Sequence, residues 1–405
     1  MSVAPSASSA AAASTPSAPG ADAPSGAVNP LANDQHVATV VLVDDSGVER
    51  RFLRSILGTD PGLLVVGEAR TGRDALALVE RLRPSAVVLD LELAGMAAIE
   101  IIERIMASVP TPILVCSTQG DAERAAAALA AGAVDVVARP MTSDADRTMY
   151  GDAVLRGVRV ASRVRVITHP RARLKNRASA AAAAADATAT SATPALAGSA
   201  DRRPEPTVSE GTVDLVVIGA STGGPQALAH LLGALPIGFA PAIVVVQHMA
   251  DGFIEGLASW LDTLCALPVA IATDGCRLRG GTVTIAPGAR NLIVNDHLRI
   301  SFEPPAETQF HIPGVDATFQ SVARNIGPRA IGVLLTGMGR DGAIGLKAMR
   351  DAGAITIGQD EESSTVYGMP GAAVACGAVQ RELPLVEIAP ELVAILQGDS
   401  FGGSG

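Results

Sequence analysis

Aromatic side chains and cysteines are scarce in this chain of 405 residues. Aromatic residues make up 2% of it, against 48% for hydrophobic residues as a whole, so its cores must be mainly aliphatic, as suits an α/β architecture. The 4 cysteines show no CxxC spacing, which argues against a zinc site and indicates a reducing compartment. Apolar runs of about 18 residues are absent, as is a basic leader before an apolar segment, so we expect a cytoplasmic protein without membrane insertion.

Positive charge is also in deficit. The chain has 31 Lys and Arg residues against 41 Asp and Glu residues, which gives a net charge of −10 at neutral pH. Because nucleic acid attracts a cationic surface, this balance argues against nucleic acid as a partner. The length allows two ordinary domains, each with its own core, together with some flexible sequence.

Low-complexity sequence separates two candidate domains. Residues 1–36 are rich in Ala, Ser and Pro, and a similar composition returns within residues 161–210. Such segments bury too little apolar surface to offset the entropy of ordering, so we predict a disordered tail and a flexible linker. The domains that remain are residues 37–160 and 211–397, and residues 398–405 form a short flexible tail.

Short β-branched runs alternate with helical patterns in both candidate domains. In the first domain these predicted strands are residues 37–43, 63–68, 86–90, 112–116 and 134–137. In the second they are residues 213–220, 242–248, 282–287, 330–337 and 354–359. Strands that alternate with helices predict a parallel, doubly wound sheet, in which functional groups gather at the carboxyl ends of the strands.

Acidic residues follow the first and third predicted strands. Asp44, Asp45 and Asp90 would meet at one sheet edge, together with Ser117 and Arg139 from the ends of the next two strands. Three carboxylates suit Mg²⁺, and the last of them could then accept a phosphoryl group as a nucleophile. An Asp at a strand end also commonly caps the next helix, and for any single residue the two interpretations are equally good. The set as a whole favours the phosphoryl site.

A Gly-rich turn follows the first strand of the second domain. The pattern G-x-S-x-G is formed by Gly219, Ser221 and Gly223, between a buried strand and a helix. Small neighbours permit a sharp turn that exposes the hydroxyl, so the serine is a candidate nucleophile. The same kind of turn binds phosphate groups in other proteins, and the pattern alone does not separate the two interpretations.

A histidine and an aspartate follow later strands of the same domain. His248 ends the strand AIVVVQH, and Asp341 lies between glycines after the strand at 330–337. Together with Ser221 they could form a triad, in which the histidine is the base and the aspartate orients it. Taken singly, each could be a hydrogen-bonded strand end or a turn residue, and His311 competes as the base.

Backbone amides could stabilise an oxyanion in this site. The candidates are Thr222, next to the serine, and the turn that holds Met338 and Gly339; the sequence does not distinguish them. The triad order along the chain is Ser, His, Asp, which differs from the Ser, Asp, His order of α/β-hydrolases. A standard α/β-hydrolase is therefore disfavoured.

Both domains resemble known families through sets of motifs. The first resembles response-regulator receiver domains through LVDDS, LDLELAGM, Ser117 and Pro140. The second resembles the catalytic domain of chemotaxis protein-glutamate methylesterases, the CheB family, through IGASTGGPQAL, VVQHM, IAPG, HIPGVDATF, LLTGMGRDGAIGLKAMRDAGA and YGMPGAA. The order of receiver, linker and methylesterase is also the architecture of that family.

The resemblance implies a fold, an activity and partners. It implies a flavodoxin-like receiver ahead of a doubly wound methylesterase domain, with Mg²⁺ at the receiver and no cofactor for the esterase. The activity would be hydrolysis of glutamyl γ-methyl esters on chemoreceptors, and deamidation of specific glutamines, through Ser221, His248 and Asp341. A chemotaxis histidine kinase would phosphorylate Asp90, and the receiver would control the esterase.

The sequence departs from the family patterns at several positions. Arg139 stands where receivers carry Lys, Ala94 where they carry Pro, and residues 97–98 are both Ala where many have Asp-Gly. In the second domain Gly314 replaces the usual Ser, which leaves the triad intact. A planar guanidinium is not equivalent to a compact ammonium, so phosphorylation of the first domain stays an open question.

Two other classes of protein share part of this pattern. A DNA-binding response regulator would end in a compact helix-turn-helix, which the long second domain lacks. A receiver-linked, non-catalytic binding module could use the Gly-rich turn at 219–224 for a nucleotide, but the G-x-G-x-x-G spacing is missing.

Overall fold

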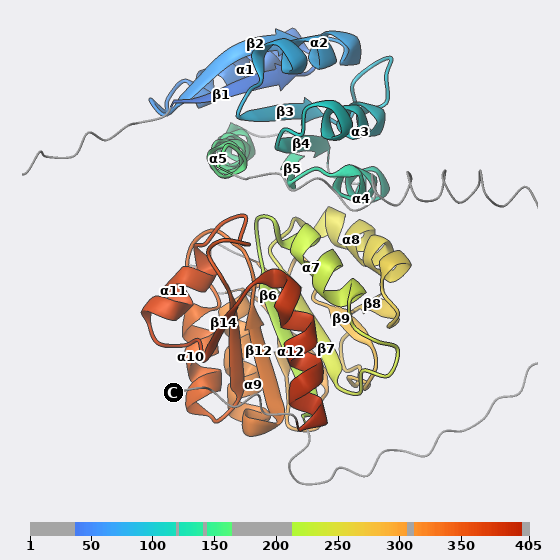
Figure 1. Ribbon diagram of the computed structural model, residues 1–405, viewed down its shortest axis with the longest axis vertical. Helices are drawn as coiled ribbons and strands as arrows, with labels where there is room; N and C mark the ends of the chain where they lie inside the picture. Colours follow the sequence, from blue (N-terminus) through green and yellow to red (C-terminus); the bar gives the residue numbers. More distant parts are fainter. Residues whose placement is uncertain (1–36, 119–120, 141–143, 164–212, 306–311, 399–405) are drawn as a thin grey trace, which may run out of the picture. The chain divides into compact units, whose positions relative to one another are not determined.

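The computed structural model describes residues 37–118, 121–140, 144–163, 213–305 and 312–398. The predicted N-terminal tail, most of the predicted linker, nearly all of the C-terminal tail and the competing base His311 lie outside the described residues. Two α/β regions are described, residues 37–163 (the first region) and 213–398 (the second region), and each has its own parallel sheet (Figure 1).

The first region is a five-stranded parallel sheet with the strand order β2-β1-β3-β4-β5. All five strands predicted from the sequence are confirmed, within two residues at each end. The elements are β1 Ala38–Val43, α1 Gly47–Leu57, β2 Leu63–Ala69, α2 Gly72–Leu82, β3 Ala86–Asp90, α3 Ala98–Ser108, β4 Ile113–Thr118, α4 Ala122–Ala131, β5 Asp135–Arg139 and α5 Asp144–Ala161.

Helices cover both faces of this sheet, as the doubly wound prediction requires. Side chains alternate along β1, so that Val40 and Leu42 pack toward α1 and α5, whereas Val41 and Val43 pack toward α2 and α3. The period of two places apolar residues on both faces, which is why the strands are almost continuously β-branched. Because every strand is parallel, all carboxyl ends meet at one edge.

The second region is a seven-stranded parallel sheet with the order β14-β13-β12-β6-β7-β9-β8, and β10 and β11 form a separate antiparallel pair. Its elements are β6 Leu215–Ala220, α7 Gly224–Gly233, β7 Ala242–Gln247, α8 Asp251–Leu264, β8 Val269–Ile271, β9 Val283–Ile285, β10 Asn291–Val294, β11 Ile300–Glu303, α9 Val315–Asn325, the 3₁₀ helix η1 Gly327–Arg329, β12 Ala330–Leu334, α10 Ala343–Asp351, β13 Ile355–Gln359, α11 Met369–Ala375, β14 Arg381–Leu383 and α12 Leu385–Gln397.

Helices again form a layer on each face. α7, α8 and α12 cover one face of the second sheet, and α9, α10 and α11 cover the other (Figure 1). The five predicted strands of this region are confirmed as β6, β7, β9, β12 and β13, although β9 and β12 are shorter than expected. The edge strands β8 and β14 and the β10–β11 pair were not predicted, because each spans only three or four residues.

No helix in the described part of the chain is long and apolar enough to span a membrane. The sheet order also has a consequence for function. β12, β6 and β7 are direct neighbours at the centre of the second sheet, so the loops after these three strands lie side by side.

Candidate functional sites

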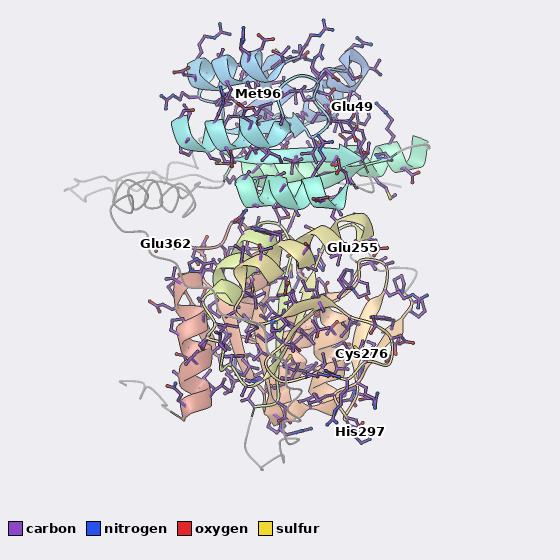
Figure 2. The ribbon with its side chains drawn as sticks, turned by 90° about the vertical axis from the view of Figure 1, so that its right-hand side faces the viewer. Glu49, Met96, Glu255, Cys276, His297 and Glu362 are labelled. Atoms are coloured by element: carbon purple, nitrogen blue, oxygen red, sulfur yellow. The ribbon has the colours of Figure 1, made fainter. Side chains whose placement is uncertain are left out.

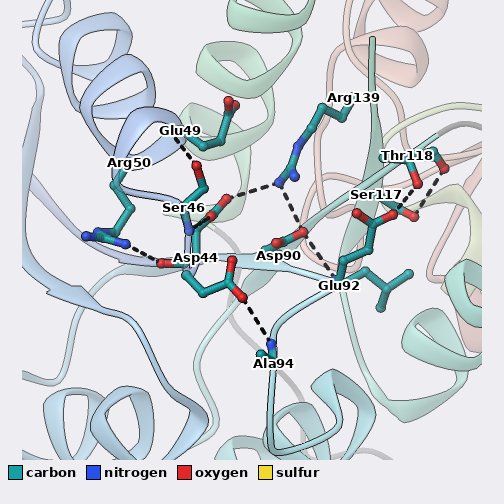
Figure 3. A network of polar contacts seen from close by, with 12 residues as sticks. Asp44, Ser46, Glu49, Arg50, Asp90, Glu92, Ala94, Ser117, Thr118 and Arg139 are labelled. Carbon is teal, nitrogen blue, oxygen red and sulfur yellow. Dashed lines mark hydrogen bonds and ion pairs between the residues drawn. The ribbon is translucent and has the colours of Figure 1, made fainter. Parts of the chain in front are cut away.

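The acidic pocket of the first region lies at the carboxyl ends of its central strands (Figure 3). Asp44 follows β1 and Asp90 ends β3, and their side chains are 2% and 4% exposed. Asp45 is exposed, and one of its oxygens accepts from Ala94 N at 3.3 Å. Oxygens of the three carboxylates all lie within 4.8 Å of one another. The predicted acidic cluster is therefore assembled in the structure.

Arg139, at the end of β5, bridges two of these acids. Its Nη2 lies 3.1 Å from Asp44 Oδ2 and 3.0 Å from Asp90 Oδ1 (Figure 3). Asp44 Oδ1 also accepts from Ser46 N at 2.7 Å, and Asp90 Oδ1 from Glu92 N at 3.2 Å. One guanidinium thus joins the two buried carboxylates where receivers carry a lysine.

The charge of this pocket is only partly compensated. Burial, followed by the neighbouring charge of Asp90, raises the pKa of Asp44 to about 6. Burial also raises the pKa of Asp90, although Arg139 acts in the opposite direction. An all-carboxylate donor set with excess negative charge fits a hard divalent cation such as Mg²⁺. Asp44, Asp45 and Asp90 are therefore suited to hold that ion.

Two hydroxyl residues at the end of β4 face the same edge. Ser117 is fully buried and its Oγ donates weakly to Thr118 O at 3.4 Å. Thr118 Oγ1 donates to the carboxylate of Glu92 (Figure 3). Glu92 is a fourth acid at this edge. It was not predicted as a site residue, because it stands two residues after the strand within the motif LDLELAGM.

In the second region, Ser221 follows β6 at the start of a tight turn. Its backbone N donates to Thr336 O at 3.0 Å, and its carbonyl accepts from Gly224 N at 2.7 Å, which closes the turn into α7. Gly223 has φ +76°, and a Cβ there would lie 2.4 Å from Thr365, so this position requires glycine. The serine is 7% exposed. The structure thus contains the sharp turn that the pattern G-x-S-x-G predicts.

His248 follows β7, the strand next to β6. Ala220 pairs with Gln247, and His248 N donates to Ala220 O at 3.0 Å, so the histidine lies directly beside the turn of Ser221. Its Nε2 lies 2.7 Å from Asp341 Oδ2, and the two side chains are 7% and 15% exposed. The structure thereby brings all three predicted triad residues to one end of β6, β7 and β12.

The carboxylate of Asp341 is surrounded by donors. Its Oδ2 accepts from Val315 N at 2.8 Å in addition to His248, and its Oδ1 accepts from Asp316 N at 2.9 Å and Gly342 N at 3.0 Å. Burial acts to raise the pKa of this carboxyl, but the bond to His248 and the backbone amides outweigh it and hold the pKa below its usual value. The side chain therefore stays ionised as a partner for the imidazole.

Asp341 takes the place of an N-cap for helix α9. Gly314 is the N-cap residue and offers no side chain, so the first two helical amides, Val315 N and Asp316 N, bind the carboxylate instead. Asp316 in turn links α9 to α10, because its Oδ1 accepts from Gly345 N in α10 at 2.6 Å. Burial, with the nearby charge of Asp341, raises the pKa of Asp316 to about 6. Main-chain amides cannot be recognised in a sequence. The binding of these carboxylates by the starts of α9 and α10 was therefore not predicted.

The described histidines outside the triad have other settings. His230 lies on α7, and His297 lies between β10 and β11 with a side chain that is 79% exposed (Figure 2). Neither has a carboxylate partner of the kind that Asp341 gives His248. Among the described histidines, His248 is therefore the candidate base.

The predicted oxyanion candidates differ from the serine in their backbone bonds. Ser221 N is already bonded to Thr336 O. In the described part of the chain, the backbone N–H groups of Thr222, Met338 and Gly339 have no acceptor. Thr222 lies in the turn of the serine, and Met338 and Gly339 lie in the loop after β12. These three amides remain the candidates that the sequence indicated.

Comparison with known proteins gives the same division of the chain. A family model described as "CheB methylesterase" matches residues 216–392, and one described as "Response regulator receiver domain" matches residues 40–149. The matches coincide with the two described α/β regions.

Whole-length relatives also match. "Protein-glutamate methylesterase/protein-glutamine glutaminase 3" of Paramagnetospirillum magneticum is 42% identical over 90% of this chain and 98% of its own length. A second relative, numbered 2, of Anaeromyxobacter dehalogenans is 41% identical over 88% of this chain and 97% of its own length. The solved methylesterase catalytic domain of Thermotoga maritima CheB is 36% identical, covers 45% of this chain and 99% of that chain, and has a TM-score of 0.44.

Proposed function

Because this chain belongs to the CheB methylesterase family and carries a receiver domain ahead of the catalytic one, we propose that it hydrolyses glutamyl γ-methyl esters on methyl-accepting chemoreceptors. It also deamidates specific receptor glutamines, the second activity in the names of its relatives. The receiver occupies residues 37–160 and the catalytic domain residues 211–397. The enzyme works in the cytoplasm, where the signalling helices of such receptors lie.

The observation that carries this proposal is the carboxyl group of Asp341, held by three backbone amides and bonded to His248 beside the turn of Ser221. Ser221 Oγ attacks the ester carbonyl carbon while its proton passes to the imidazole. The ester C–O bond then breaks, and methanol leaves with that proton. Water attacks the acyl-enzyme by the same route, and the glutamate carboxylate is released. For a glutamine substrate, the leaving group is ammonia.

The ring nitrogen that acts as the base follows from the hydrogen bonds. In the Ser-His-Asp triads of serine proteases the aspartate bonds Nδ1, and Nε2 faces the serine. Here Asp341 bonds Nε2 at 2.7 Å, so Nδ1 is the nitrogen assigned to the proton of Ser221. The negative charge of Asp341 stabilises the imidazolium that forms. The amides of Thr222, Met338 and Gly339 are the donors proposed for the oxyanion. Since nucleophile, base and acid are all side chains of the protein, the esterase requires no cofactor.

The first experiment compares methanol release from a methylated chemoreceptor cytoplasmic fragment by the full-length protein and its Ser221→Ala variant. Removing the nucleophile of a triad typically costs about 10⁶-fold in kcat, so release should fall to background. Ser301→Ala, an exposed serine in β11, is the matched control and should keep wild-type activity. No release above background from either protein, with both folded, would instead favour a non-catalytic binding module.

The receiver domain is proposed to regulate this activity through phosphorylation of Asp90 by a chemotaxis histidine kinase. Asp90 Oδ1 is engaged by Arg139 and Glu92 N, which leaves Oδ2 as the nucleophilic oxygen. Bound Mg²⁺, held by Asp44, Asp45 and Asp90, would neutralise charge on the incoming phosphoryl group. Ser117 supplies the hydroxyl that responds to the phosphoryl group, and Arg139 a cation in place of lysine.

Phosphorylation can be tested directly with radiolabelled phosphodonor. Asp90→Asn should abolish labelling of the full-length protein by the kinase, because the amide cannot form the acyl phosphate. Asp152→Asn, an exposed residue on α5, should label as the wild type does. Labelling that survives in Asp90→Asn would assign the phosphoryl group to another residue and overturn this part of the proposal.

A further inference from the structure

Gln247 is a polar residue in the middle of the apolar second sheet. It is the last residue of β7, after AIVVV, and its side chain has no solvent exposure. Its Nε2 donates to Ser221 O at 2.8 Å and to His248 O at 3.0 Å. A single side-chain amide therefore joins the main chain of the nucleophile residue to that of the base residue.

The carbonyl oxygen at the other end of this side-chain amide makes no compensating interaction within the described residues. Gln247 Oε1 is buried and, among the described residues, has no hydrogen-bond partner. It lies against the start of α7, where a Cβ on Gly224 would come within 2.0 Å of it. A buried acceptor without a donor is destabilising, and an apolar side chain of the same length would avoid that cost. Fold stability alone does not account for a glutamine here.

A second buried glutamine in the same sheet shows the contrast. Gln359, at the end of β13, is 1% exposed and satisfied at both ends: its Oε1 accepts from Thr336 N at 2.8 Å, and its Nε2 donates to Ser363 O at 2.8 Å. That pattern is what a structural glutamine achieves. Gln247 has only its donor side in use, and both acceptors belong to residues of the triad.

We propose that Gln247 is a positioning residue for the esterase reaction, which fixes the separation of Ser221 and His248 by holding their two carbonyls on one amide. This inference rests on the proposed function. The turn of Ser221 is otherwise closed by the bond from Gly224 N to Ser221 O and stays tethered to β12 through Thr336. Loss of the two hydrogen bonds from Gln247 Nε2 therefore leaves the turn folded but allows the nucleophile to shift relative to the base.

A shift of this kind acts on proton transfer more than on substrate binding. The amide of Gln247 is buried, and its hydrogen bonds go to the main-chain carbonyls of Ser221 and His248. Misplacement of reacting groups by about 1 Å costs on the order of 100-fold in rate. The expected signature is a fall in kcat with KM unchanged, whereas a purely structural role would change the melting temperature and the fraction of active protein.

The test uses Gln247→Met and Gln247→Glu in the full-length protein. Three quantities are measured: kcat and KM for methanol release, the rate constant for phosphonylation of Ser221 by a fluorophosphonate, and the melting temperature. For Gln247→Met we expect kcat and the phosphonylation rate to fall about 10- to 100-fold. KM should stay within about twofold, because the substrate contacts are unchanged.

Gln247→Glu adds a pH readout and covers the case in which the methionine variant does not fold. A carboxylate would repel both carbonyls, whereas a protonated carboxyl can donate one hydrogen bond. The activity of Gln247→Glu relative to wild type should therefore rise as the pH falls. Equal activity of the two proteins across the pH range would overturn the positioning role.

Thr356→Val is the matched control for loss of a buried hydrogen bond. Thr356 lies in β13 with no exposure, and its Oγ1 donates to Ala378 O at 2.7 Å, away from the triad. This variant should lose stability and keep kcat per active site. If Gln247→Met also keeps its kcat per active site, Gln247 is only structural. If wild type is phosphonylated but releases no methanol, the proposed function fails while the phosphonylation rates still decide the role of Gln247.

Discussion

The two sites of this protein bury carboxylates at the same place in the same kind of sheet, but they compensate the charge differently. In the catalytic domain, Asp341 accepts four hydrogen bonds, three of them from backbone amides, and its pKa is lowered. In the receiver domain, Asp44 and Asp90 share one arginine, and burial raises the pKa of both.

The difference matches what each carboxylate has to do. In the proposed reaction, Asp341 orients an imidazole and stabilises its positive charge, so it must remain ionised and immobile. Rigid main-chain donors at two helix starts achieve this. In the proposed regulation, the receiver pocket binds a cation and a phosphoryl group reversibly. Uncompensated negative charge attracts the cation, and one side-chain guanidinium can move aside more easily than a helix terminus.

Among the changes that test this comparison between the two sites, Asp341→Asn should have the largest effect. An amide in this place presents N–H groups to Val315 N or Asp316 N, which are themselves donors, and it removes the charge opposite His248. In serine proteases the corresponding change lowers kcat about 10⁴-fold, and we expect a loss of about 10³- to 10⁴-fold in methanol release. The melting temperature should fall as well, because at least one buried donor loses its acceptor.

The control for this variant is Asp351→Asn, at the end of α10, where an exposed carboxylate pairs with Lys347. Exposed pairs contribute little, so this change should leave both kcat and the melting temperature near wild type. If Asp341→Asn kept more than a tenth of the wild-type kcat, the carboxylate would not be the triad acid.

A smaller effect is expected in the receiver pocket from Arg139→Lys. Arg139 Nη2 now bonds an oxygen of both Asp44 and Asp90, and these oxygens are then less available to a divalent cation. A lysine side chain is shorter and carries its charge on one ammonium group, so it should leave at least one of these two oxygens unbonded. Loss of one such bond, about 1.4 kcal/mol, corresponds to a tenfold increase in metal affinity.

Titration of the full-length protein with Mn²⁺, followed by electron paramagnetic resonance, measures this affinity without any enzymatic activity. Arg147→Lys is the matched control, because Arg147 pairs with Glu49 at 3.0 Å and stands over the Phe52 ring. It should leave metal affinity unchanged. Equal affinity in wild type and Arg139→Lys would mean that the guanidinium does not compete with the cation.

Much of the fold followed from the sequence, because strands buried on both faces are β-branched runs, and the candidate functional residues stand at or just after the ends of several of them. Asp44, Asp90, Ser221 and His248 were found in this way. What the runs could not give is the order of strands within each sheet, or the short strands β8, β10, β11 and β14. A segment of three or four residues carries too little periodicity to be recognised.

The sequence predicted the side chains of the candidate site and named candidate amides for the oxyanion, but it did not predict the amides that bind Asp341. The backbone amides that bind Asp341 belong to Val315 and Asp316, and any residue but proline would supply them. Arg139 was recognised as a departure from the receiver pattern, but its bridge between two strands depends on geometry. Gln247 did leave a signal, since a polar side chain interrupts an apolar strand directly before the candidate base.

Asp316→Asn should have the smallest effect. It should raise the stability of the protein, whereas Asp341→Asn should lower it. Burial raises the pKa of Asp316 from 3.8 to about 6, so the folded protein holds this proton more tightly than the unfolded chain does. Stability therefore falls as the pH rises from about 4 to 6, and the full penalty persists above pH 6.

An asparagine at position 316 removes the ionisable group, and its Oδ1 can still accept from Gly345 N. The melting temperature at pH 8 should rise, by about 2–4 °C for each kcal/mol of penalty that is removed, and the gain should vanish below pH 4. The exposed Asp274→Asn should show no such pH dependence. A gain of equal size at both pH values would show that removal of a buried charge is not its cause.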